Sequence, residues 1–331
     1  MNPKRILVIQ TAFIGDVILA TSLLENLHQG FPGAQIDFLV RKGNEGLFEN
    51  HPYLTNILIW KKKEGKFKSL WALLQQIRKT EYDWVINLQR FGGTGMLTGF
   101  SKAPKRTGFA KNPLSFLFTD QFPHQIGNGV HETTRNHTLI EHEVSEALAR
   151  PRLYPSSSDF DFVKSYQSKP YICIAPASVW FTKQYPAGKW IQLINQLAGQ
   201  YQIYLLGGPG DTMLAESIHS QVNLKESVQN LCGNLSFLQS AALMKSSAMN
   251  FVNDSAPMHI SSAVNAPVTA VYCSTVPEFG FGPLSDSAHV VEVLEKLTCR
   301  PCGLHGHKTC PEGHFKCALD IKTEQLLEVL P

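Results

Sequence analysis

Apolar and polar positions alternate along the first half of the chain in a way that predicts strands followed by helices. An apolar run at Ile6–Ile9 predicts a buried strand. Apolar residues at helical spacing follow a polar turn and predict a helix that begins at Gly15 and Asp16. Further strands are predicted at 35–40, 57–60, 84–88 and 106–109, and helices at 45–49, 70–77 and 139–148. Apolar strands that alternate with helices are typical of a parallel sheet covered on both faces, so the predicted fold class is α/β.

The same alternation restarts after a stretch rich in proline and serine at 150–158. Strands are predicted at 171–175, 204–206, 250–252 and 268–272, and helices at 189–197, 237–244, 257–264 and 324–330. We therefore predict two Rossmann-like domains, at 1–155 and 171–331, joined by a linker at 156–170. A cleft between two such domains would suit a reaction of two substrates.

Composition places the chain among folded soluble proteins, with 43% hydrophobic and 17% charged residues. The start of the sequence has no secretory signal and no apolar run is long enough to span a membrane, so a cytoplasmic protein is expected. Residues 1–165 carry 20 Lys and Arg against 15 Asp and Glu, whereas residues 166–331 carry 10 against 12. The basic first half suits an anionic partner, although a scatter of solvated lysines would give the same count.

Polar turns follow strands and precede helices at three places in the second half. They lie at 175–178, which leads to Lys183, at 207–211 and at 253–259. Backbone N–H groups at a helix start bind anions, and Lys183 adds a positive charge, so a pyrophosphate is the expected guest. Such turns also favour Gly, Ser and Asp for structural reasons. The chain has neither the dinucleotide-binding fingerprint nor the ATPase phosphate loop, and no cofactor is expected.

The order of these motifs resembles the ADP-heptose:lipopolysaccharide heptosyltransferases, which form glycosyltransferase family 9 and have the GT-B fold. The resemblance extends over nearly the whole chain. It rests on Gly15-Asp16-Val17-Ile18, on Pro176-Ala177 followed by Lys183-Gln184-Tyr185-Pro186 and Trp190, and on Asp254-Ser255-Ala256-Pro257-Met258-His259. The cysteine-rich tail at 299–317 is similar to that of the heptosyltransferase II-like branch.

This resemblance implies an inverting, metal-independent transfer of heptose from ADP-heptose to the inner core of lipopolysaccharide. The acceptor would be a phosphorylated Kdo–lipid A or an already heptosylated core, and no nucleic acid is expected as a partner. Asp16 matches the general base of the family, and one ionised carboxylate suffices to accept the proton of the attacking hydroxyl. Lys183 would stabilise the charge that develops on the leaving diphosphate.

The remaining site residues are assigned to the donor or to the acceptor. Donor binding is expected of Ser178, Lys183, Gly207, Gly208, Gly233, Asp254, Ser255, Ala256 and His259. His259 could equally be a helix residue packed beneath its turn. Acceptor binding is expected of Gly15, Arg41, Gln89, Arg90 and Arg106, with Lys105 beside them. The basic stretch at 61–68, with Trp60 and Phe67, could contact an anionic membrane surface at the inner face of the cytoplasmic membrane, or could be a solvated loop.

Two clusters of potential metal ligands remain. The cysteines of the tail, Cys299, Cys302, Cys310 and Cys317, could bind a structural zinc ion or remain reduced thiols in a compact loop. Asp159 and Asp161 imitate the metal motif of another glycosyltransferase fold, but they follow no strand and are expected to be a coincidence.

Two alternatives stay open at this point. One is a family relative that uses another nucleotide sugar or another acceptor. The other is a catalytically silent protein that only binds a nucleotide sugar. The presence of both Asp16 and Lys183 favours an active enzyme.

Overall fold

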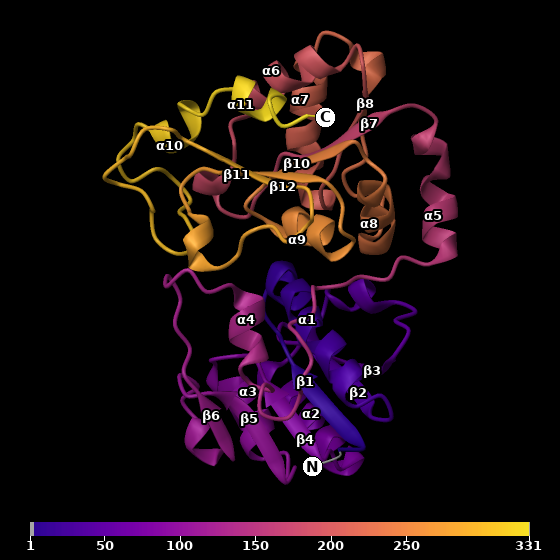
Figure 1. Ribbon diagram of the computed structural model, residues 1–331, viewed down its shortest axis with the longest axis vertical. Helices are drawn as coiled ribbons and strands as arrows, with labels where there is room; N and C mark the ends of the chain where they lie inside the picture. Colours follow the sequence, from indigo (N-terminus) through magenta and orange to yellow (C-terminus); the bar gives the residue numbers. More distant parts are fainter. Residues whose placement is uncertain (1–2, 331) are drawn as a thin grey trace. The chain divides into compact units, whose positions relative to one another are not determined.

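The computed structural model describes residues 3–330, apart from the side chain of Lys66. The chain divides into two compact units: unit 1 extends to Tyr154, and unit 2 begins at Pro155. Each unit contains one six-stranded parallel sheet. Figure 1 shows helices lying against each sheet. The predicted α/β class is therefore confirmed.

Unit 1 has the strand order β3-β2-β1-β4-β5-β6, and every pair is parallel. Its strands are β1 (Arg5–Ile9), β2 (Gln35–Arg41), β3 (Leu54–Trp60), β4 (Trp84–Asn87), β5 (Lys105–Phe109) and β6 (Asp120–Phe122). Its helices are α1 (Ile14–Gly30), η1 (Glu45–Phe48), α2 (Lys66–Thr80), α3 (Gly92–Gly99), η2 (Ser115–Leu117) and α4 (Glu132–His137). The strand order reverses between β1 and β4, which is where open α/β sheets bind ligands.

Unit 2 has the strand order β12-β11-β10-β7-β8-β9, which repeats the topology of unit 1. Its strands are β7 (Tyr171–Ala175), β8 (Gln202–Leu205), β9 (Val228–Asn230), β10 (Met249–Asn253), β11 (Val268–Tyr272) and β12 (Ala288–Glu292). Its longer helices are α5 (Ser157–Val163), α6 (Ala187–Leu197), α7 (Thr212–Gln221), α8 (Phe237–Lys245) and α9 (Ala256–Ala263). Short helical turns complete it: η3 (Lys164–Gln167), η4 (Phe181–Lys183), η5 (Pro209–Asp211), η6 (Lys225–Ser227), η7 (Pro277–Phe279), α10 (Lys316–Leu319) and α11 (Glu324–Leu327). Here the order reverses between β7 and β10.

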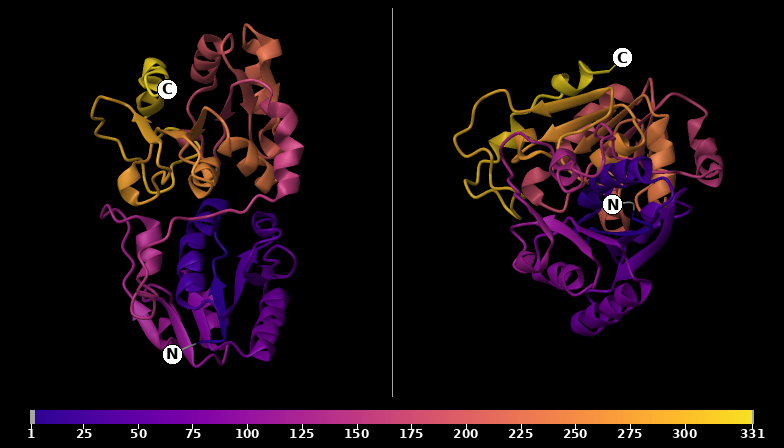
Figure 2. Two further views of the ribbon diagram at one scale, coloured as in Figure 1. Left: turned by 45° about the vertical axis from the view of Figure 1, so that its right-hand side comes forward. Right: turned by 60° about the horizontal axis from the view of Figure 1, so that its bottom comes forward.

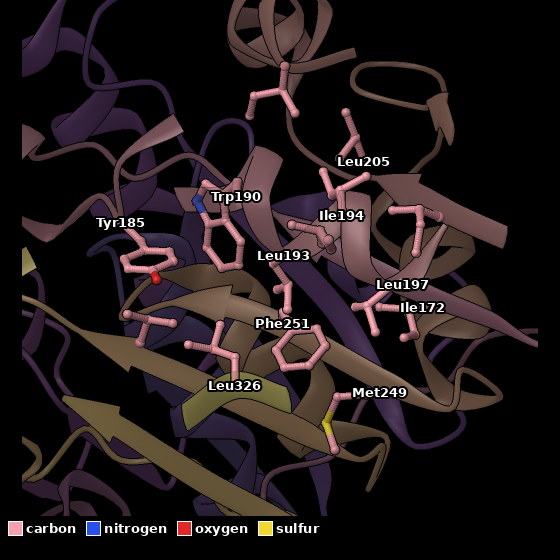
Figure 3. Packing of buried hydrophobic residues seen from close by; sticks show 14 of the residues in the cluster. Ile172, Tyr185, Trp190, Leu193, Ile194, Leu197, Leu205, Met249, Phe251 and Leu326 are labelled. Atoms are coloured by element: carbon pink, nitrogen blue, oxygen red, sulfur yellow. The ribbon is translucent and has the colours of Figure 1, made fainter. Parts of the chain in front are cut away.

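The core of unit 2 lies between its sheet and the helices that cover it. Trp190, Leu193 and Ile194 of α6 pack with Phe251 of β10, and Leu326 of α11 joins them, as Figure 3 shows. All of these side chains are fully buried, so the helices cover this part of the sheet. Burial on this scale contributes about 1.5–3 kcal/mol for each large apolar side chain. It gives the loops after β7 and β10 a rigid base.

The predicted helix at 139–148 is wrong, because residues after 137 form turns and an extended segment. Polar side chains on buried α1 explain the difference. Asn26 donates to the carbonyl of Ala147 at 2.8 Å, and Ser22 donates to the carbonyl of Ala149 at 2.5 Å. Because these contacts use the backbone of 147–149, they compete with helical hydrogen bonds. The helix of this region is α4, which lies earlier in the chain and packs on α1.

The predicted linker at 156–170 is folded for most of its length. Ser156 and Asp159 form a reciprocal capping box at the start of α5. Helix α5 packs along α8 within unit 2, and the views in Figure 2 agree on this. The Asp159 carboxylate therefore caps α5.

No helix within residues 3–330 combines the length and the apolar character needed to cross a membrane. The predicted absence of a secretory signal rests partly on residues 1 and 2, which lie outside the described residues.

Candidate active site

Unit 1 places Asp16 where the strand order reverses. The turn after β1 leads directly into α1, and Asp16 lies in the first turn of that helix. Arg41 ends β2, and Arg90 follows β4, so both approach the same carboxyl end of the sheet. The predicted group of Gly15, Asp16, Arg41 and Arg90 therefore meets at one edge.

The environment of Asp16 makes it a stronger base than an ordinary aspartate. Burial, reinforced by the negative charge of Glu132, raises the pKa of Asp16 to about 6, although backbone hydrogen bonds and Arg90 oppose this shift. A carboxylate with this pKa is still ionised at neutral pH and accepts a proton more readily. Arg41 lies over the exposed ring of Phe13 at 4.7 Å, and its charge interacts with Asp16.

A buried charged group beside Asp16 was missed by the sequence reading. Glu132 lies at the start of α4. Its Oε2 accepts a hydrogen bond from Arg135 Nε at 2.8 Å, and His124 Nε2 lies 3.8 Å from the same oxygen. Burial would raise the pKa of Glu132, but His124 and Arg135 outweigh it and hold that pKa below its usual range. Glu132 therefore remains negative and disfavours ionisation of Asp16. The feature of the sequence that could have pointed to this group is the Glu-x-x-Arg spacing of Glu132 and Arg135, which is common on helices.

Two predicted acceptor residues have other roles in the structure. Gln89 is 6% exposed and donates through its side chain to buried Gln10, so it joins the ends of β4 and β1. Arg106 lies near the amino end of β5, where it donates to the carbonyls of Ala103 and Leu117. The prediction is wrong for Arg106, because this end of the strand is opposite to the Asp16 edge.

Lys105 begins β5 at that same opposite end, pairs with Glu143 and lies over Trp84 at 4.5 Å. It therefore does not join Asp16 either, whereas Arg41 and Arg90 both interact electrostatically with Asp16.

Unit 2 brings Lys183 and Asp254 into direct contact. Lys183 ends η4 after β7, and Asp254 follows β10, the neighbouring strand. Lys183 Nζ lies 2.6 Å from Asp254 Oδ2, and the Thr275 hydroxyl donates to the same oxygen at 2.6 Å. Both side chains of the ion pair are largely buried, at 16% and 8% exposure. The ion pair and the hydrogen bond from Thr275 together fix the orientation of the Asp254 carboxylate.

Asn253 fixes the loop that carries Lys183. Its amide nitrogen donates to the carbonyl of Pro176 at 2.8 Å, and its Oδ1 accepts from the backbone of Tyr185 at 2.9 Å. Asn253 is fully buried, so it joins the loop after β7 to the end of β10. The sequence reading did not select it, although it directly precedes the predicted Asp254-Ser255 motif.

The remaining predicted donor residues lie around this pair or on the next loop. Ser255 is the N-cap of α9, and Ala256 begins that helix, so alanine is compatible with the backbone there. His259 is buried within α9. Ser178 lies in the turn after β7, where its carbonyl accepts from Gln184 at 2.6 Å.

Gly207, Gly208 and Gly233 follow β8 and β9 and pack against each other. Gly233 has a φ of +78°, and a Cβ there would lie 3.0 Å from Pro209 Cα. Its N–H donates to the carbonyl of Gly207 at 3.0 Å, while Asp211 accepts from the backbone of Gly208. These contacts explain the presence of glycine in these loops without any role in ligand binding.

The four tail cysteines line one small cavity together with Thr182, Ser274 and His314. Cys299 Sγ lies 3.9 Å from His314 Nε2. Within residues 3–330, however, no three candidate ligands are arranged to hold a metal ion. Burial, with the neighbouring thiols, raises the pKa of Cys317 to about 11, so this cysteine is protonated. The zinc site stays a prediction.

Only part of the stretch predicted to contact a membrane is exposed. Trp60 is only 3% exposed and packs against Gly93, so it cannot reach a lipid surface. Phe67 and Trp71 are 81% and 54% exposed, and both belong to α2. Lys62 donates to the carbonyl of Thr11 at 2.9 Å and thus attaches this stretch to the turn before Asp16. The side chain of Lys66, part of the predicted basic stretch, lies outside the described residues.

The chain is similar to known proteins over nearly its whole length. The sequence model of glycosyltransferase family 9 (heptosyltransferase) matches residues 70–315. Lipopolysaccharide heptosyltransferase 2 of Escherichia coli K12 is 24% identical, with 98% of this chain and 97% of the relative covered. Lipooligosaccharide heptosyltransferase 2 of Haemophilus influenzae is 23% identical, with 98% of each chain covered.

Two solved structures have the same fold. The structure of E. coli ADP-heptose lipopolysaccharide heptosyltransferase II has a TM-score of 0.81 at 22% identity, and the match covers 98% of this chain and 97% of that one. A glycosyl transferase family 9 structure from Veillonella parvula has a TM-score of 0.83 at 23% identity, covering 98% and 95%. The fold is therefore the GT-B fold of these proteins.

Proposed function

The chain belongs to glycosyltransferase family 9, and from this premise we propose that it transfers heptose from ADP-heptose to the inner core of lipopolysaccharide. Relatives named lipopolysaccharide and lipooligosaccharide heptosyltransferase 2 match nearly its whole length. The observation that carries the proposal is the pair of charged groups at the two points of strand reversal. Asp16 with Arg41 and Arg90 lies in unit 1, and Lys183 with Asp254 lies in unit 2.

In the donor half of the reaction, Lys183 binds the diphosphate of ADP-heptose. Its charge opposes the negative charge that grows on ADP as the glycosidic bond breaks. The start of α9 adds the backbone N–H of Ala256 and a positive helix end, both of which favour phosphate oxygens, whereas Pro257 has no N–H. Asp254 holds Lys183 in place and accepts hydrogen bonds from sugar hydroxyls.

In the acceptor half, Asp16 takes the proton of the attacking hydroxyl while that oxygen bonds to the anomeric carbon. The attack comes from the face opposite to ADP, so the configuration is inverted. Arg41 and Arg90 bind phosphate or carboxylate groups of a Kdo–lipid A or heptosylated acceptor. Because Lys183 and the start of α9 neutralise the diphosphate, the proposed transfer needs no metal ion.

Donor binding tests the sugar and nucleotide assignment. Thermal shift measurements with ADP-heptose, GDP-mannose and UDP-glucose are expected to show the largest stabilisation with ADP-heptose, because a ligand that binds only the folded protein raises its stability. A larger shift with GDP-mannose or UDP-glucose would instead favour a family relative with another donor.

The pH dependence of kcat/KM is expected to report the pKa of Asp16. The base is active when ionised, so kcat/KM should be constant well above pH 6. Below a pKa of about 6 it should fall about tenfold per pH unit. A profile that stays flat down to about pH 4, the range of an ordinary aspartate, would contradict the raised pKa.

We also propose that α2 contacts an anionic membrane surface at the inner face of the cytoplasmic membrane, where the lipid acceptor would lie. Phe67 and Trp71 are four residues apart and share one face of α2. Lys61, Lys63 and Lys68 are exposed next to them, so apolar and positive groups lie side by side.

The double variant Phe67→Ser and Trp71→Ser is expected to weaken binding to anionic phospholipid vesicles about tenfold or more, because burying a large apolar side chain contributes about 1.5–3 kcal/mol. Sedimentation with vesicles measures this. Phe116→Ser is the matched control, since Phe116 is 72% exposed and lies in η2 of the same unit. Equal losses in the double variant and the control would argue against a docking face on α2.

A further inference from the structure

The cysteine-rich tail, residues 299–317, lies directly against the turn that carries Lys183. The backbone of His307 forms two reciprocal hydrogen bonds with Thr182, one with its backbone and one with its side chain. Thr182 N–H donates to the carbonyl of His307 at 3.1 Å, and His307 N–H donates to Thr182 Oγ1 at 2.7 Å. Thr182 is 1% exposed and immediately precedes Lys183, so its position also fixes the backbone position of Lys183.

Gly306 makes this approach possible. Its φ of +75° favours glycine, and a Cβ at this position would lie 2.8 Å from Thr182 Oγ1 and 3.1 Å from Lys183 Cγ. The backbone of the tail therefore packs against the aliphatic part of Lys183. A side chain at 306 would have to displace the turn.

The tail also holds the other partner of the ion pair. Arg300 donates to the carbonyls of Cys273 at 2.7 Å and Thr275 at 2.8 Å, and Glu292 accepts from the same guanidinium at 2.7 Å. Thr275 in turn donates to Asp254. The hydroxyl of Ser274 donates to Thr182 at 3.0 Å, so the loop after β11 and the Lys183 turn are joined to each other as well.

We propose that the cysteine-rich tail positions the Lys183–Asp254 pair for the diphosphate of the donor, with Thr182, Gly306 and Arg300 as the positioning residues. This inference rests on the proposed role of Lys183. The alternative is a tail that only contributes to the stability of unit 2. The two differ in one respect: positioning acts on the diphosphate, whereas general stability does not distinguish between parts of the nucleotide.

The test compares the affinities for ADP and for adenosine, which lacks the diphosphate. Thr182→Val keeps the size of the side chain but removes the acceptor for His307. It is expected to weaken ADP binding about tenfold and leave adenosine binding unchanged, since one displaced charged contact has an effect of this order. Thr182→Ser retains the hydroxyl and is expected to restore ADP binding. Thr269→Val, which removes another buried hydroxyl of unit 2 in β11, is the matched control and should bind both ligands normally.

Lys183→Gln separates the possible outcomes. If Lys183→Gln weakens ADP selectively and Thr182→Val does not, the positioning inference is overturned while the role of Lys183 stands. If Lys183→Gln leaves the ratio of ADP to adenosine affinity unchanged, the role of Lys183 and the inference both fall. Should Thr182→Val not fold, Gly306→Ala tests the same contact from the tail and is expected to lower the same ratio; an unchanged ratio there would also overturn the inference.

Discussion

Asp16→Asn is expected to abolish most of the turnover while leaving ADP-heptose binding intact. Asparagine has nearly the same shape but cannot accept the proton of the acceptor hydroxyl. General base catalysis typically contributes about 10²–10⁴-fold, so kcat should fall by that factor. Steady-state kinetics and thermal shift with donor measure the two effects. Near-normal turnover in Asp16→Asn would refute the assignment of the base.

The same substitution is expected to stabilise the fold at neutral pH. The pKa of Asp16 is about 6 in the folded protein, above its ordinary value of 3.8, so the ionised carboxylate opposes folding. Removing it should raise the free energy of unfolding at pH 7.5 by about 1–3 kcal/mol, because one pKa unit corresponds to about 1.4 kcal/mol.

This gain should shrink as the pH falls from 6 towards 4 and vanish below 3.8, where the folded and unfolded states both bind the proton. Asp120→Asn is a suitable control, since Asp120 lies at the amino end of β6. We expect it to leave turnover unchanged.

Lys183→Gln is expected to lower kcat about 10²–10³-fold, because it removes a charge that stabilises the leaving diphosphate. It should also destabilise unit 2. Asp254 is 8% exposed in its side chain and would keep only the hydrogen bond from Thr275. Leaving a buried carboxylate without its cation is costly.

Lys183→Arg keeps the positive charge but changes its geometry, so it should recover stability more fully than turnover. Lys225→Gln, an exposed lysine of the same unit, is the control for charge alone. Full turnover in Lys183→Gln would contradict the proposed role.

Sequence patterns were sufficient for the parts of the site that depend on strand order. The strand at Ile6–Ile9 and a helix start close to Asp16 follow from local periodicity alone, although α1 begins at Ile14. Lys183 and Asp254 follow two strands that were both predicted, and the parallel sheet places β7 and β10 side by side. Family motifs added the roles but not the ion pair between them.

The parts that were missed depend on contacts distant in sequence. Asn26 and Ser22 of α1 bind the backbone of 147–149, which no local pattern at 139–148 could reveal. The error there hid α4 and with it Glu132, the charge that acts on Asp16. Arg106 was assigned to the acceptor for its charge, although the predicted strand at 106–109 already placed it at the amino end, away from Asp16.

The most direct test of the account is the product of the purified protein with ADP-heptose and either Kdo–lipid A or a heptosylated core acceptor. Mass spectrometry and NMR of the product measure the added sugar and its anomeric configuration. We predict one added heptose per ADP released, with the configuration inverted relative to the donor and product lost in Asp16→Asn. Transfer with retained configuration, or release of ADP without a glycosylated acceptor, would contradict the account.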